Sequence, residues 1–304
     1  MREYPVSTSI HLTRDPDYIV PLDHQIKRII DAGFRYLDFN FLDHYYSPAS
    51  PFTTDKWRSW IGVARETADK RGATFNQAHA PCPVFNCEKD MPLFREYCRR
   101  SFIGCKDLGI PLMVFHHIGN PKNFGSDLTK FEFDKLFFSW MLEDAHKYGV
   151  GIAIENLFQG GEVGGVRLNP VDYVIALSDE LNDPLVGVCC DVGHCHIKKY
   201  NLIGTPTDTI DVGENLKRIG HRLRATHIHD NISLEDDHIP PFMGDIDWKG
   251  VMRALDEIDY KHSFTFEAHY TVSRMNRNGL DETVTDTAIH LLWQIGDAIV
   301  HINR

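Results

Sequence analysis

The sequence lacks several features that would assign it to a large class of proteins at once. No apolar run approaches the roughly 18 residues of a membrane-spanning helix, and residues 1–10 contain no hydrophobic region typical of a signal peptide. A Gly-rich phosphate loop and a dinucleotide-binding fingerprint are also missing. We therefore expect a chain without a membrane partner and without a nucleotide cofactor.

Paired cysteines and an excess of basic residues are lacking too. The seven cysteines contain no CxxC motif, which predicts reduced thiols and a cytoplasmic protein. Cys189 and Cys190 lie in an apolar run, where cysteine usually acts as a small hydrophobic residue. Acidic residues outnumber basic ones by 43 to 32, and the net charge of −11 argues against a general nucleic-acid-binding surface. No linker divides the chain, so we expect a single domain over residues 1–304.

Eight short apolar runs alternate with helical patterns along the chain. We expect strands at 6–12, 34–41, 74–80, 111–117, 151–156, 186–192, 224–230 and 263–269. We expect helices at 22–32, within 54–71, and at 90–108, 129–148, 170–180, 211–220, 247–257 and 283–301. Short apolar strands separated by helices are typical of parallel sheets covered on both faces. The pattern predicts an α/β fold, a (β/α)8 TIM barrel.

Polar side chains recur near the ends of these strands, in steps of roughly 36 to 40 residues, the length of one βα unit. They are His79, His116, Glu155, Asp191, His227 and Glu267. The C-terminal ends of barrel strands converge around one mouth, so we expect these side chains to meet there.

The last four of these positions offer two glutamates, one aspartate and one histidine. This mixed oxygen and nitrogen set suits Mn²⁺, Co²⁺, Mg²⁺ or Zn²⁺ and disfavours thiophilic metals. Each residue alone has an ordinary structural explanation, but buried carboxylates are costly unless paired or metal-bound, and four coincidences are hard to accept. For His79 and His116, a role as core histidines is as well supported as a functional one.

Four motifs resemble the sugar phosphate isomerase/epimerase family, which shares a xylose isomerase-like barrel with apurinic-site endonucleases. They are IEN at 154–156, DVGH at 191–194, HIHDN at 227–231 with DDHIPPFMGDIDW at 236–248, and FEAH at 266–269. The resemblance implies that one divalent metal is bound by Glu155, Asp191, His227 and Glu267. His227 is preferred to His229 because the family's ligand precedes an acidic residue, here Asp230, by three positions. His194 would contact the substrate or a second metal.

The same resemblance leaves a multi-metal alternative open. In the endonuclease branch, further metals use histidines from the third and fourth strands and a DxH element in the loop after the seventh. This chain has His79, His116, Asp236 and His238 in the matching places. It departs from many relatives at Phe242-Met243-Gly244, where they have Gly-Glu-Gly.

The leading hypothesis is a metal-dependent isomerase or epimerase of a sugar or sugar derivative. Glu155 and Glu267 would form an acid/base pair that moves a proton next to a carbonyl through an enediolate. A lyase that dehydrates a keto-inositol or cleaves a glycoside is an alternative, and a multi-zinc apurinic-site endonuclease is a further one. His194 would orient a hydroxyl, while His229 and His269 would fix the orientation of the ligands. The expected partners are a small carbohydrate and, since such barrels often associate, further copies of the chain.

Overall fold

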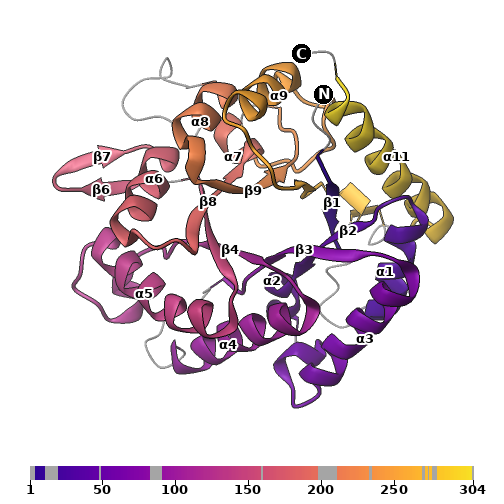
Figure 1. Cartoon of the computed structure of the whole chain (residues 1–304), viewed down its shortest axis with the longest axis horizontal. Coiled ribbons are helices and arrows are strands. Elements are labelled where there is room, and N and C mark those ends of the chain that lie inside the picture. Colours follow the sequence, from indigo (N-terminus) through magenta and orange to yellow (C-terminus); the bar gives the residue numbers. More distant parts are fainter. Residues whose placement is uncertain are drawn as a thin grey trace.

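Parallel strands close into a barrel in which neighbouring strands follow the order of the chain, with β10 pairing back to β1 (Figure 1). The computed structural model describes residues 4–10, 20–47, 49–82, 91–158, 160–197, 211–232, 235–268, 271–272, 274–275 and 279–302. The barrel strands are β1 (Val6–Ser9), β2 (Tyr36–Asn40), β3 (Thr74–His79), β4 (Leu112–His116), β5 (Gly151–Glu155), β8 (Val186–Asp191), β9 (Leu223–Ile228) and β10 (Phe264–Phe266). The predicted (β/α)8 barrel is confirmed.

Helices surround the outside of the barrel (Figure 1). The long ones are α1 (Leu22–Asp31), α3 (Trp57–Arg71), α4 (Met91–Leu108), α5 (Lys130–Tyr148), α6 (Pro170–Leu181), α8 (Val212–Ile219), α9 (Trp248–Glu257) and α11 (Glu282–Val300). Their ends follow from local chemistry. Thr129 and Glu132 form a capping box at the start of α5, and Gly149 ends that helix at φ 70°. In the described residues, no helix combines the length and apolar character needed to cross a membrane.

The short elements that the sequence pattern missed include two strands and two helices. β6 (Gly161–Val163) and β7 (Val166–Leu168) form an antiparallel hairpin at the periphery of the barrel (Figure 1). Its turn is Gly164-Gly165, and both residues have the positive φ that a tight hairpin turn needs. α2 (Phe41–Tyr46) and α7 (Val192–His196) begin directly after β2 and β8, where the side chains of Asn40 and Asp191 cap their first turns.

Two separate layers of side chains cover the two faces of the strands. The main apolar core lies between strands and helices, where the ring of Phe39 packs 5.2 Å from Trp60 and 5.7 Å from Phe75. The alternate strand positions form a small second cluster inside the barrel, composed of Val114, Ala153, Cys189 and Ala225. Inside the barrel, the next positions along β4, β5, β8 and β9 carry the polar side chains of the mouth. The apolar cluster therefore forms a floor beneath them.

Candidate metal centre

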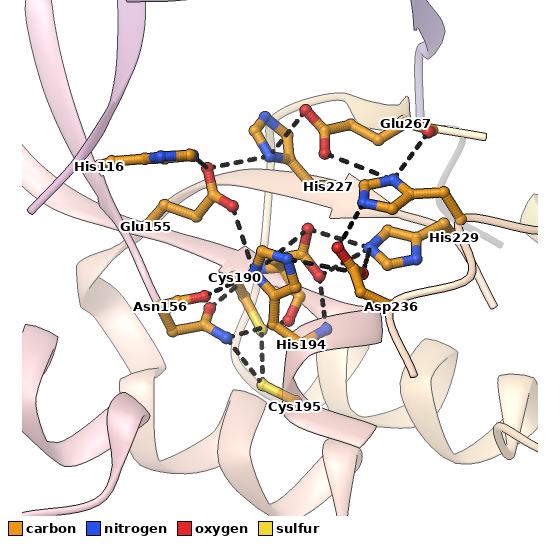
Figure 2. A network of polar contacts seen from close by, with 12 residues as sticks. His116, Glu155, Asn156, Cys190, His194, Cys195, His227, His229, Asp236 and Glu267 are labelled. Carbon is orange, nitrogen blue, oxygen red and sulfur yellow. Dashed lines mark hydrogen bonds and ion pairs between the residues drawn. The ribbon is translucent and has the colours of Figure 1, made fainter. Parts of the chain in front are cut away.

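Histidines and carboxylates gather at the C-terminal ends of the strands (Figure 2). Four of the predicted residues are the last residues of β3, β4, β5 and β8: His79, His116, Glu155 and Asp191. His227 lies one residue before the end of β9, and Glu267 directly follows β10. His229, which we predicted inside its strand, instead lies just past the end of β9. His269 lies outside the described residues.

Glu155 occupies the centre of this group. Its Oε2 atom lies 3.4 Å from Nε2 of His79 and 3.4 Å from Nε2 of His116. The Nε2 atoms of the two histidines are themselves only 3.2 Å apart. Glu155 is buried, yet within the described part of the chain its Oε2 has no hydrogen-bond partner. The structure thus brings the undecided histidines, His79 and His116, onto the same carboxylate oxygen.

His227 lies between two carboxylates that come from different strands. Its Nδ1 atom is 3.3 Å from Oε2 of Glu155 and 3.3 Å from Oε1 of Glu267 (Figure 2). The ring is fully buried, and neither nitrogen has a hydrogen-bond partner among the residues that the structure describes. A buried imidazole without partners is costly, so this geometry needs a further group to satisfy it.

Asp191 lies beside this group but faces a different histidine. Its two carboxylate oxygens are 3.0 and 3.1 Å from Nε2 of His229. His194 connects Asp191 to Glu155, because its Nδ1 atom lies 3.7 Å from Asp191 and 3.4 Å from Glu155. Asp191 pairs directly with His227 in the β8–β9 register, so it belongs to the same part of the mouth.

A further cluster lies next to Asp191 and unites His194 of α7 with residues of the segment after β9. Asp236 is 3.7 Å from Nε2 of His194, 3.9 Å from Nε2 of His229 and 3.0 Å from Nε2 of His238. The rings of His229 and His238 stack with their centroids 3.9 Å apart. The ligand atoms of these four residues lie within 4.8 Å of one another.

These residues fit divalent metals. Two ligands that each lie about 2.1 Å from one cation are at most about 4.2 Å apart, and the contacts around Glu155 are all shorter. In this group of residues, the unpartnered buried atoms include Oε2 of Glu155 and both ring nitrogens of His227, and such atoms are metal ligands. Three groups of side chains could hold an ion, and the first two of them share Glu155: His79, His116 and Glu155; Glu155, His227 and Glu267 with Asp191 adjacent; and His194, His229, Asp236 and His238.

The IEN and DVGH motifs have a clear structural purpose at this mouth. The side chain of Asn156 accepts a hydrogen bond from the Asp191 N–H at 2.8 Å and donates to the Asp191 carbonyl at 3.1 Å. Gly193 lies against the ring of His229, where an added Cβ would come within 1.9 Å of a ring carbon. The two motifs therefore hold Asp191 and His229 in contact.

Asp230 organises the loop that carries the DxH element. Its carboxylate accepts hydrogen bonds from the indole Nε1 of Trp248 at 2.9 Å, the Phe242 N–H at 3.0 Å and the Ile246 N–H at 3.3 Å. A backbone bridge between Asp230 and Ile239 closes the same loop. The HIHDN and GDIDW motifs are thus parts of one structure that positions His238.

The two glutamates of the centre differ in proton affinity. Burial favours the neutral form of Glu155, but His227 and His116 outweigh it and hold the pKa of Glu155 well below its usual range. Burial raises the pKa of Glu267 to about 7, against the opposing effect of His227 and assisted by the charge of Glu155. Near neutral pH, Glu155 is therefore a carboxylate, while Glu267 holds a proton part of the time.

We expect metal loading to release protons. Burial acts to lower the pKa of His194, but Asp191 and Asp236 overcome it and raise that pKa to about 10. A metal ligand must be deprotonated, so a cation at His194 displaces a proton, and the metal affinity rises up to about tenfold per pH unit at pH values below about 10. Titration calorimetry in two buffers of different ionisation enthalpy counts these protons. His194→Gln should release about one fewer, and equal release by both proteins would contradict the expectation.

One residue of the centre escaped the sequence analysis. Cys189 packs in the apolar floor of the barrel, as expected, but it also lies within 4.8 Å of Glu155 and His227. Its spacing of two residues from Asp191 in a strand places both on the inward face, and this spacing could have revealed it. Burial raises the pKa of the Cys189 thiol to about 12, so the neutral thiol is a weak hydrogen-bonding group facing His227.

Fold and site together define a (β/α)8 barrel with a candidate metal centre at its C-terminal mouth. The chain belongs to the family described as xylose isomerase-like TIM barrel, whose model matches residues 26–290. The family resemblance drawn from the sequence motifs is thereby confirmed.

Individual proteins extend this likeness over most of the chain. Uncharacterized protein y4fM of Sinorhizobium fredii is 26% identical over 284 residues, which cover 84% of this chain and 83% of that protein. D-Psicose 3-epimerase of Clostridium cellulolyticum H10, solved with D-tagatose, superposes with a TM-score of 0.69 at 15% identity, covering 98% of this chain and 100% of that one. 3-Keto-D-glucoside 4-epimerase of E. coli superposes with a TM-score of 0.65 at 12% identity, covering 96% of this chain and 100% of that one. These structures share the fold.

Proposed function

We propose that this protein is a divalent-metal-dependent isomerase or epimerase of a sugar or sugar derivative. One observation carries the proposal: two buried carboxylates on different strands, Glu155 and Glu267, each lie 3.3 Å from Nδ1 of His227. They can therefore approach a substrate in the mouth from two sides. The shared fold of enzymes named as D-psicose 3-epimerase and 3-keto-D-glucoside 4-epimerase supports a sugar carbonyl as the reacting group.

The chemistry of such a substrate explains the need for both carboxylates. A proton next to a carbonyl is only weakly acidic, so its removal requires a positioned base and stabilisation of the developing negative charge. Glu155, which is ionised near neutral pH, is suited to take the proton, and Glu267, with a pKa of about 7, is suited to supply one. A divalent cation held by Glu155, Asp191, His227 and Glu267 would polarise the carbonyl as a Lewis acid.

The position of the returning proton decides the product. A proton returned to the opposite face of the same carbon gives an epimer, and one returned to the neighbouring carbon gives the isomeric sugar. His194 lies between Glu155 and Asp236 and can orient a substrate hydroxyl. Loss of a leaving group from the next carbon would instead give the lyase reaction, which uses the same first proton transfer.

Solvent deuterium exchange tests this proposal. The metal-loaded protein is incubated in D₂O with a panel of ketoses, aldoses and keto-inositols, and deuterium is located by NMR. We expect incorporation at a carbon next to the carbonyl, together with an epimer or isomer. Exchange followed by an unsaturated product would assign the lyase reaction, and no exchange with any panel member would contradict the proposal.

A multi-metal phosphodiesterase acting at apurinic sites is the second candidate. It is favoured by the additional ligand groups, because His79 and His116 converge on Glu155 and Asp236 contacts three further histidines. The net charge of −11 opposes a DNA substrate. Elemental analysis of the purified protein, combined with cleavage of an abasic duplex, separates the candidates. Three tightly held zinc ions with cleavage would favour the nuclease.

A further inference from the structure

A cavity with polar and apolar lining adjoins the metal centre. It has a volume of about 820 Å³ and is formed by the segments that follow β3, β4 and β5 together with the start of α5. Two of its lining residues connect it to the centre: His117 directly follows His116, and the ring of Phe158 lies 4.5 Å from that of His194. The volume is in the range of pockets that hold small molecules. A substrate at the metals can therefore extend into this space.

The polar side chains that line the cavity are suited to an anion. Two lysines, Lys122 and Lys130, line it together with Asn120 and His117, and no carboxylate is among its lining residues. Lys122 is exposed and has no ion-pair partner within the described part of the chain. The side-chain oxygen of Asn120 accepts the Lys122 N–H at 3.1 Å, which leaves the amide nitrogen of Asn120 to donate. In a chain of net charge −11, a cavity whose charged lining residues are all basic is a distinct feature.

His117 is held as a hydrogen-bond donor by two residues behind it. The Lys130 ammonium donates to Nδ1 of His117 at 2.9 Å and to Asp134 at 2.8 Å. Asp134 is fixed in turn by the Tyr173 hydroxyl at 2.5 Å and the Ile118 N–H at 2.6 Å. Nδ1 of His117 also lies 3.4 Å from the Ile118 carbonyl, but the ammonium contact is 0.5 Å shorter. Because an ammonium group can only donate, this shorter contact favours Nδ1 as the acceptor and leaves the ring proton on Nε2.

The Nε2–H donor that results has no acceptor among the residues that the structure describes. His117 is only 5% exposed, and its Nε2 atom is buried with no hydrogen-bond partner among the described residues. Leaving a buried N–H unpaired is unfavourable, and such groups in folded proteins call for a specific cause. An acceptor supplied by a ligand in the adjoining cavity would satisfy it.

We propose that this cavity binds an oxyanion group, a phosphate or a carboxylate, carried by the sugar substrate. Lys122 supplies the charge, His117 and Asn120 donate hydrogen bonds, and Lys130 with Asp134 sets the tautomer of His117. This inference rests on the proposed function, since it makes the substrate an anionic sugar whose carbonyl lies at the metals. The chain then discriminates against uncharged sugars through binding rather than through the chemical step.

Matched substrates test the subsite. Deuterium exchange rates give kcat and KM for an uncharged ketose, its terminal phosphate and the corresponding uronate, with the wild type and with Lys122→Ala. For the wild type, we expect the KM of the phosphate or of the uronate to be at least tenfold lower than that of the uncharged ketose. Lys122→Ala should raise that KM about 10- to 100-fold, the effect of losing one charge-assisted hydrogen bond, with kcat and the uncharged sugar unaffected. Whether the phosphate or the uronate shows the larger change identifies the group.

Controls separate this inference from the proposed function. Lys106→Ala removes the same charge from the last turn of α4, at the opposite end of the barrel, and should leave every KM unchanged. Equal KM values for Lys122→Ala and wild type on all anionic sugars would overturn the subsite, while exchange itself would still support the isomerase. If no sugar exchanges, the proposed function fails. The subsite is then tested by itself through the binding of inorganic phosphate to the metal-loaded protein. Binding to Lys122→Ala that is at least tenfold weaker than to the wild type supports the subsite, and equal binding overturns it.

Discussion

Replacing Glu155 with glutamine is expected to lower kcat by about 10³- to 10⁴-fold, because the amide cannot accept a proton at neutral pH. Its Oε2 atom is the point on which His79, His116 and His227 converge, within 3.3 to 3.4 Å. The substitution removes the negative charge there while keeping the shape of the side chain. It also weakens the metal site, so kcat is to be measured at saturating Mn²⁺ or Co²⁺ with the bound metal quantified.

The second member of the proposed acid/base pair is tested by Glu267→Gln, which should lower kcat by a similar factor. The two variants differ in one respect. Glu267 has one close histidine, His227 at 3.3 Å, and reaches His238 only at 4.0 Å, whereas Glu155 has several histidines within 3.4 Å. Metal content should therefore fall less in Glu267→Gln. Glu162→Gln in the exposed β6 strand is a matched control that should retain wild-type activity. Either site variant turning over at wild-type rate would eliminate the acid/base pair.

The fold could be predicted because its information is local and repeated. Each strand is a short apolar run, and each helix has amphipathic spacing or recognisable ends. Asn169-Pro170 at the start of α6 and the positive-φ Gly149 after α5 are examples. Polar residues recur at regular spacing near the strand ends, and the geometry of a closed barrel is enough to predict that these residues meet at one mouth. Side-chain contacts did not have to be known for this step.

The pairing of ligands could not be predicted in the same way. The sequence placed Asp191 with Glu155, His227 and Glu267, yet the direction of its carboxylate toward His229 depends on the missing Cβ of Gly193. The sequence alone likewise does not decide whether His79 and His116 are core or site residues. Their distances to Glu155, which depend on the folded structure, place both beside this carboxylate. Such contacts are made between loops and strands far apart in sequence, and each depends on one rotamer.

The loop after β9 illustrates tertiary structure overriding local preference. Phe242 adopts φ 69° and His238 φ 48°, a left-handed region that disfavours bulky residues. At the position of Phe242 many relatives carry glycine, which is free of this penalty. The hydrogen bond from the Phe242 N–H to Asp230 holds the conformation, and a single sequence gives no sign of it. The cavity next to His117 was missed for the same reason, since four separate segments form it.

Removal of bound metal is expected to abolish exchange and to lower the melting temperature by about 10 °C. The carboxylates of Glu155, Asp191 and Glu267 are buried close together, and without a cation they repel one another. A metal present at about 1,000 times its Kd contributes about 4 kcal/mol, and each kcal/mol shifts a chain of this size by roughly 2–4 °C. Dialysis against a chelator, calorimetry and re-addition of Mn²⁺ or Co²⁺ measure both effects.

The His227→Ala variant distinguishes metal loss from general damage by the chelator. It lacks the imidazole that lies between Glu155 and Glu267, so its activity should already be absent and its melting temperature should not respond to chelation at that site. Stepwise removal from the wild type adds a second readout, because bound metal and exchange activity are compared after each step. Loss of exchange with the ion at His227 would place the chemistry between Glu155 and Glu267. Full activity in the chelated protein, with no change in melting temperature, would rule out a metal role and leave the unpartnered nitrogens of His227 to be explained by another ligand.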